Sequence, residues 1–88
     1  MSRERVVETA LRHGVRSVRV FGSVARGTDA EGSDLDLLVE FEPGRDLFDL
    51  IELKYELEEV SGRSVDVVTE KSLSPHIREK VLREAMPL

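Results

Sequence analysis

Apolar and polar residues alternate in three short stretches of the chain, a pattern typical of strands that bury one face. In the first stretch Val18 and Val20 alternate with Ser17 and Arg19. Glycine, proline and polar residues that form turns stand between these stretches and the segments around them. The pattern predicts strands over residues 17–21, 34–41 and 64–69.

Around the strands, apolar residues recur at the spacing of a buried helix face. Ser2, Asp46 and the pair Ser74-Pro75 mark where three of these helices begin, because such residues cap or open helices. The predicted helices cover residues 3–13, 23–26, 47–60 and 75–85. In the longest helix, the apolar residues expected to face the core are Leu47, Phe48, Leu50, Ile51, Leu57 and Val60.

These elements follow one another in the order α-β-α-β-α-β-α within a chain of 88 residues. The order predicts a single α/β (α+β) domain over residues 1–88, with a small mixed sheet covered by helices. A domain of this size buries only about 60 to 65 % of the surface that its unfolded chain exposes. Its core is therefore thin, and no part of the chain is left to form a separate substrate-binding lobe.

Composition narrows the classes of function. The formal net charge is −5, and general binding of nucleic acid is not expected, because phosphate backbones attract clustered Lys and Arg. The basic residues Arg78, Lys80 and Arg83 are interpreted as a solvated helix face. The chain has no cysteine, which excludes disulfides and thiolate metal sites. Charged residues near the start argue against a secretion signal, and the composition does not suggest a membrane protein, so we expect a cytoplasmic location.

Three aspartates stand in segments that otherwise read as strands. Asp34 and Asp36 are two positions apart, so both point to one face, about 6.6 Å apart along the strand. Asp66 stands between Val65 and Val67 in the third strand. Carboxylates brought together without a cation repel one another, and at least one pKa rises. Ligation by oxygen alone suits Mg²⁺ or Mn²⁺, so the acids predict a site for a divalent cation.

Gly22 and Ser23 supply a second feature of this site. Glycine allows a close backbone approach, and free N–H groups with the Ser23 hydroxyl can bind a phosphate. Arg26 can contact phosphate or pair with a surface acid, and the sequence leaves both open. Gly22 meets Asp34 only if the first two strands are antiparallel, and Asp66 joins them only if the third strand is parallel to the second. The chemistry thus predicts a mixed sheet with the second strand in the middle and helix 47–60 as the crossover.

The stretch "GSVARG", followed by "SDLDLLV" and later by "VDVV", resembles the minimal nucleotidyltransferases (MNT) of the DNA polymerase beta superfamily. It is particularly similar to the MNT antitoxins encoded beside HEPN-domain toxins. The resemblance covers nearly the whole chain and implies the nucleotidyltransferase fold. It also implies that Gly22 and Ser23 hold a nucleoside triphosphate and that Asp34 and Asp36 bind metal. Asp66 is then expected to help bind metal and to prepare the attacking hydroxyl.

The reaction implied by this resemblance is Mg²⁺-dependent transfer of AMP from ATP to a tyrosine hydroxyl of a HEPN-type toxin, which silences the toxin. One alternative is a binding module that neutralises its partner by covering it, with little or no catalysis. A third alternative is transfer to a small molecule or to RNA. It is weaker, because the chain lacks a recognition lobe and a basic surface. The thin core favours a complex with a partner, and an oligomer is possible.

Overall fold

The computed structural model of the chain describes residues 2–28 and 32–88. It contains the four predicted helices, three predicted strands, and two short elements that the pattern did not predict. In chain order the elements are α1 (Arg3–Arg12), β1 (Val15–Phe21), α2 (Gly22–Arg26), β2 (Leu35–Phe41), α3 (Leu47–Ser61), β3 (Val65–Thr69), the 3₁₀ turn η1 (Glu70–Ser72), α4 (Pro75–Glu84) and β4 (Met86–Pro87).

The sheet has the strand order β3-β2-β1-β4. β1 pairs antiparallel with β2, and β2 pairs parallel with β3, so β2 is flanked on both sides and α3 forms the crossover. The mixed sheet predicted from the chemistry is therefore confirmed. β4 adds an edge strand antiparallel to β1, where Met86 faces Val20. Two residues are too short a stretch to show alternation, so the pattern of apolar and polar residues does not predict this strand.

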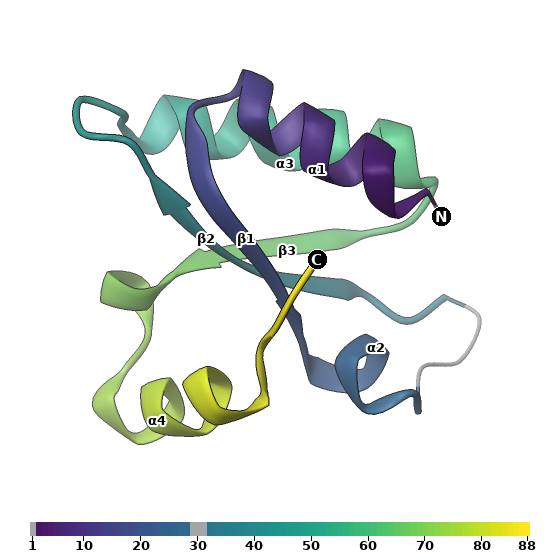
Figure 1. Ribbon diagram of the computed structural model, residues 1–88, viewed down its shortest axis with the longest axis vertical. Helices are drawn as coiled ribbons and strands as arrows, with labels where there is room; N and C mark the ends of the chain where they lie inside the picture. The colour runs from purple at the N-terminus through teal and green to yellow at the C-terminus, as the bar shows by residue number, and fades with distance from the viewer. Residues whose placement is uncertain (1, 29–31) are drawn as a thin grey trace.

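The core lies between the sheet and the helix pair α1 and α3. In Figure 1 these two helices lie on one side of the strands, while α2 and α4 lie on the other side. Leu38 and Val81 are also buried, yet they lie outside this main core. The main core consists of Val6, Ala10, Val15, Val20, Leu35, Leu37, Val39, Leu53, Leu57, Val65 and Val67. The sheet thus has a packed face toward α1 and α3, and a second face that carries the predicted site.

The starts of all three predicted strands differ from the prediction, and that of β3, at Val65, by one residue only. β1 begins at Val15, two residues early, because its pairing with β2 is irregular between Val15 and Ser17. This bulge lets Val15 and Val18 pack on the same core although they are three positions apart. β2 begins at Leu35, so Asp34 lies just before the strand rather than inside it.

The predicted core face of α3 is partly wrong. Leu53 and Leu57 are fully buried and Leu50 packs against the core, whereas Phe48 is 72 % exposed. Leu47, Ile51 and Tyr55 are also exposed and extend the apolar surface around Phe48. Helical spacing is satisfied by two neighbouring stripes on this helix, and only one of them faces the sheet. No helix in the described part of the chain is long and apolar enough to cross a membrane.

The predicted capping residues cap the N-termini of α1 and α3. Ser2 accepts a hydrogen bond from the backbone N–H of Arg5 at 3.3 Å. Asp46 accepts bonds from the N–H groups of Phe48 and Asp49, and the Asp49 carboxylate accepts a bond from the N–H of Asp46 at 2.8 Å. This reciprocal capping box fixes the residue at which α3 starts. It therefore helps to set the length of the crossover between β2 and β3.

Candidate active site

Asp36 and Asp66 are direct neighbours across the parallel pair of β2 and β3. Both residues are out of phase with the core residues of their strands, so both point to the sheet face opposite α1 and α3. Asp34, two positions before Asp36, is exposed at the entrance to β2. The expectation that Asp66 lies on the same side of the sheet as the other predicted acid in β2 is confirmed.

The charges of the two other acids act on Asp36. Burial raises the pKa of the Asp36 carboxyl group, and the nearby charges of Asp66 and Asp34 raise it further. Arg26 opposes this by lowering the same pKa, and Glu84 adds to the rise. The site is therefore a place where negative charge accumulates and where a cation would relieve the repulsion.

Gly22 brings the end of β1 against the acids. Its φ is +73°, a left-handed conformation that favours glycine. A Cβ atom at this position would fall onto Oδ2 of Asp36. Phe21, the residue before it, is the register partner of Asp36 in β2. The predicted meeting of the glycine-serine turn with the acids is thus present in the structure.

Ser23 lies one residue inside α2 and does not begin it. The helix starts at Gly22 with Phe21 as its N-cap, because the turn tightens one residue earlier than predicted. The Ser23 carbonyl accepts a hydrogen bond from the N–H of Thr28 at 2.9 Å. Its hydroxyl makes no hydrogen bond with any residue of 2–28 or 32–88, so this group is free to bind a ligand.

Of the two roles that the sequence left open for Arg26, the structure shows the pairing with an acid. Arg26 forms an ion pair with Glu84 of α4, and its charge also reaches Asp36. The Glu84 side chain is only 16 % exposed, whereas that of Arg26 is 52 % exposed. Glu84 is a site residue that sequence reasoning missed. An acid 58 positions from Arg26 carries no local signal that connects the two.

The three aspartates offer oxygen ligands only, which are the donors that Mg²⁺ prefers. Within the described ranges, no three acidic or histidine side chains converge as a complete set of metal ligands. Mg²⁺ usually takes one or two carboxylates and completes its shell with water and substrate phosphates. The neighbouring Asp36 and Asp66, with Asp34 beside them, therefore fit a cation that binds together with a nucleotide.

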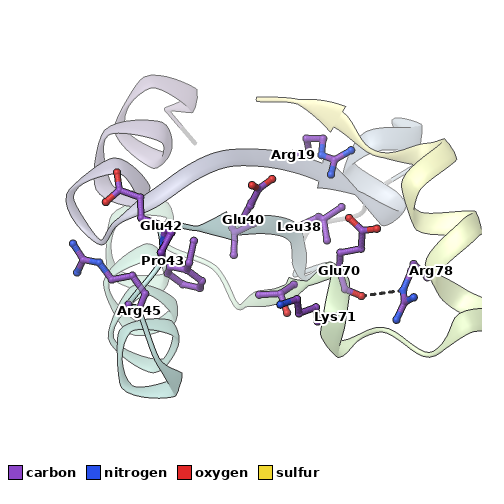
Figure 2. Close-up of a pocket in the computed structure, with 13 residues that line it drawn as sticks. Arg19, Leu38, Glu40, Glu42, Pro43, Arg45, Glu70, Lys71 and Arg78 are labelled. Atoms are coloured by element: carbon purple, nitrogen blue, oxygen red, sulfur yellow. Dashed lines mark hydrogen bonds between the residues drawn. The ribbon is translucent and has the colours of Figure 1, made fainter.

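A hollow of about 710 Å³ lies on the same sheet face as Asp36, farther along β2. Its lining contains none of the predicted site residues. Figure 2 shows Leu38 and Arg19 there, which belong to the strand pair one row beyond Asp36. Arg78 donates a hydrogen bond to the carbonyl of Glu70 at 3.1 Å (Figure 2). It donates another to the carbonyl of Leu73 at 3.0 Å. This arginine joins α4 to η1, so its role is structural.

Comparisons with known proteins show what the chain is similar to. The family model described as "Nucleotidyltransferase domain" matches residues 3–87. A candidate protein adenylyltransferase of Methanocaldococcus jannaschii is 46 % identical over 84 residues, which are 96 % of this chain and 90 % of the relative. Protein adenylyltransferase MntA of Thermococcus cleftensis is 47 % identical over 75 residues, or 85 % of this chain and 76 % of the relative.

Solved structures extend the comparison. A structure described as a candidate minimal nucleotidyltransferase superposes with a TM-score of 0.88 at 58 % identity, covering 98 % of this chain and 88 % of the other. A chain from the tri-AMPylated Shewanella oneidensis HEPN toxin in complex with MNT antitoxin superposes with a TM-score of 0.73 at 19 % identity. That match covers 96 % of this chain and 66 % of the other, and it shows a shared fold alone.

Proposed function

Since the chain belongs to the nucleotidyltransferase domain family, we propose that it transfers AMP from ATP to a hydroxyl group of a partner protein, with Mg²⁺ as cofactor. The observation that carries this proposal is the register that places Asp36 beside Asp66 with Gly22 packed against Asp36. Two relatives are named as protein adenylyltransferases or candidates for that activity, which supports AMP as the transferred group.

The residues divide the work as follows. The backbone of Gly22 can approach the polyphosphate closely because no side chain intervenes, and the free Ser23 hydroxyl donates to a phosphate oxygen. Arg26 adds a positive charge beside them. A divalent cation held by Asp34, Asp36 and Asp66 would neutralise charge that develops on the phosphate oxygens during transfer.

In the transfer step, the oxygen of the acceptor hydroxyl forms a bond to the α-phosphorus of ATP. The bond from that phosphorus to the bridging oxygen of the β-phosphate breaks, and pyrophosphate leaves with the electron pair. The proton of the hydroxyl passes to the carboxylate of Asp66, which acts as the base. Asp66 suits this role because it lies at the same end of the sheet as the turn that holds the phosphates.

We further propose that the acceptor belongs to a HEPN-type toxin and that the chain is its antitoxin. The superposed structure of a HEPN toxin with MNT antitoxin supports this choice of partner.

A direct test uses the chain, radiolabelled ATP, Mg²⁺ and a purified HEPN-domain protein encoded beside it. The wild type should transfer label to the partner and abolish the toxicity of the partner. The combined variant Asp34→Ala and Asp36→Ala should transfer less label, by more than about 100-fold. Loss of a group that only supports a metal ligand already lowers activity or metal affinity by about 10 to 100-fold. Absence of labelling by the wild type, or undiminished labelling by the double variant, would contradict the proposal.

A second function is favoured by one observation, the absence of a complete set of three metal ligands within the described ranges. In this alternative, the chain neutralises its partner by complex formation with little turnover. The double aspartate variant would then still bind the partner and suppress its toxicity. If the variant binds the partner and fails to suppress it, inhibition depends on the transfer reaction.

A further inference from the structure

The exposed apolar side chains of the molecule gather on α3. Of the large apolar residues that the described part of the chain exposes, only Leu11, Ile77 and Met86 lie elsewhere, on three separate elements. A contiguous exposed apolar surface is typical of an interaction site, whereas single exposed apolar residues are ordinary. Helical spacing joins the others into one stripe, the α3 stripe, which consists of Leu47, Phe48, Ile51 and Tyr55.

The negative charge of the chain is concentrated on the same helix. Residues 46–61, which are α3 and its N-cap, contain six acidic residues and one lysine, so this segment alone has a formal charge of −5. The net charge of the whole chain is also −5, so the charges of all other residues cancel. A field of one sign around an apolar surface favours partners of the opposite sign. The six acids are Asp46, Asp49, Glu52, Glu56, Glu58 and Glu59.

Two of these acids, Glu52 and Glu59, border the α3 stripe. Glu52 follows Phe48 by four positions, so the two side chains are neighbours on the helix surface. Glu59 has the same relation to Tyr55. Both acids are exposed, and neither forms an ion pair or a hydrogen bond with residues 2–28 or 32–88. They are therefore available to the cations of a second molecule.

The α3 stripe lies away from the candidate active site. In Figure 1 α3 lies on one side of the strands, and α2, which begins at Gly22, lies on the other side. Asp36 and Asp66 point to the sheet face opposite α3. A partner held at the stripe would therefore leave the acids and the turn at Gly22 open to a nucleotide.

We propose that the α3 stripe and its acidic border form the surface by which this chain holds its partner protein. The partner is expected to present an apolar surface bordered by Lys and Arg, such as the face of an amphipathic helix. A second copy of this chain lacks that chemistry, because it would bring another segment of charge −5 against the first. The inference rests on the proposed function for the identity of the partner, the HEPN-type protein that receives AMP.

The test measures, by titration calorimetry, binding of the chain to the purified HEPN-domain protein encoded beside it, and separately to ATP. Phe48→Ala combined with Tyr55→Ala removes the aromatic part of the stripe. We expect this stripe variant to bind the partner about tenfold or more weakly, because aromatic residues carry much of the binding energy of an interface. Its affinity for ATP should stay within about twofold of the wild type, because the stripe and the acids are on opposite sides of the sheet. The matched control, Leu11→Ala combined with Ile77→Ala, truncates exposed apolar residues of other helices and should bind the partner as the wild type does.

A second comparison tests the charge. Glu52→Lys combined with Glu59→Lys reverses the acidic border, and Glu8→Lys combined with Glu79→Lys makes the same change in net charge at exposed positions of α1 and α4. We expect the border variant to bind the partner about tenfold or more weakly at low salt, with a smaller loss as salt is added. The control should change the affinity by less than about twofold, because its charges lie away from the stripe.

Several results would overturn this assignment. Wild-type affinity for the partner in both the stripe variant and the border variant would reject it and leave the proposed function intact. Weaker ATP binding by the stripe variant would show a disturbed fold in place of a lost contact. A chain that sediments as a dimer on its own, and as a monomer after Phe48→Ala with Tyr55→Ala, would assign the stripe to a second copy.

Two further results separate this inference from the proposed function. If the wild type binds the partner without transferring AMP, and the stripe variant loses that binding, the docking surface stands and the proposed function is rejected. A wild type that does not bind the partner at all would reject both.

Discussion

Gly22 is the residue on which the contact between the turn and the acids depends most directly. Alanine at this position must adopt a left-handed backbone and also displace the Asp36 carboxylate. Gly27 has nearly the same φ, +72°, but a Cβ atom there would meet nothing within 4 Å. Gly27→Ala should therefore cost about 1 to 2 kcal/mol in the free energy of unfolding, and Gly22→Ala should cost more and also weaken ATP binding.

Chemical denaturation of both variants measures this difference, because the backbone cost cancels between them. Equal losses of stability with equal affinity for ATP would show that the close approach to Asp36 has no energetic effect.

The raised pKa of Asp36 predicts how the stability of the protein depends on pH. An acid whose pKa is raised by folding is charged in the native state only at a cost, and this cost disappears as the pH falls through the native pKa. In buffer without divalent cations, Asp36→Asn should therefore have a higher free energy of unfolding than the wild type at pH 7. The difference should vanish at about pH 3, where the aspartate is protonated in both the native and the unfolded state.

Thermal unfolding of both proteins across this pH range tests the sign. A variant that is less stable than the wild type at pH 7 would show that Asp36 is stabilised by its surroundings, contrary to the repulsion from Asp66 and Asp34.

At the scale of single elements, α3 offers a contrast between two apolar residues on one helix. Leu53 is fully buried, and Leu53→Ala should cost about 2 to 5 kcal/mol because it leaves a cavity in a thin core. Phe48 is 72 % exposed, so Phe48→Ala should change the free energy of unfolding by less than about 1 kcal/mol. Urea denaturation of the two variants compares them directly, and similar losses would mean that the exposed stripe packs against something in solution.

Helix α3 also shows where sequence reasoning stops. Its start at Leu47 follows from the Asp46 cap, and its role as a crossover follows from the need to bring Asp66 beside Asp36. Which of its two apolar stripes is buried depends on the direction from which the sheet approaches, and no pattern within the helix contains that information. β4 and Glu84 were missed for a related reason, because both are defined by contacts with residues more than fifty positions away.

At the scale of the whole molecule, the net charge predicts how the chain interacts with nucleic acid. With a net charge of −5, the chain should not bind duplex DNA in the micromolar range at physiological salt. A gel-shift or fluorescence anisotropy titration at about 150 mM salt measures this. Micromolar binding that weakens steeply with added salt would show that the basic residues of α4 serve a nucleic acid and would favour transfer to RNA over transfer to a protein.

The parallel register of β2 and β3 has a consequence for how such a domain can lose its chemistry. Because side chains alternate along a strand, inserting one residue between Ser64 and Val65 would turn Asp66 toward α3 and send its valine neighbours to the outside. Every residue of the motif would still be present, and a reader comparing sequences would see no damage. In this domain, an intact motif is informative only together with the length of chain that connects its parts.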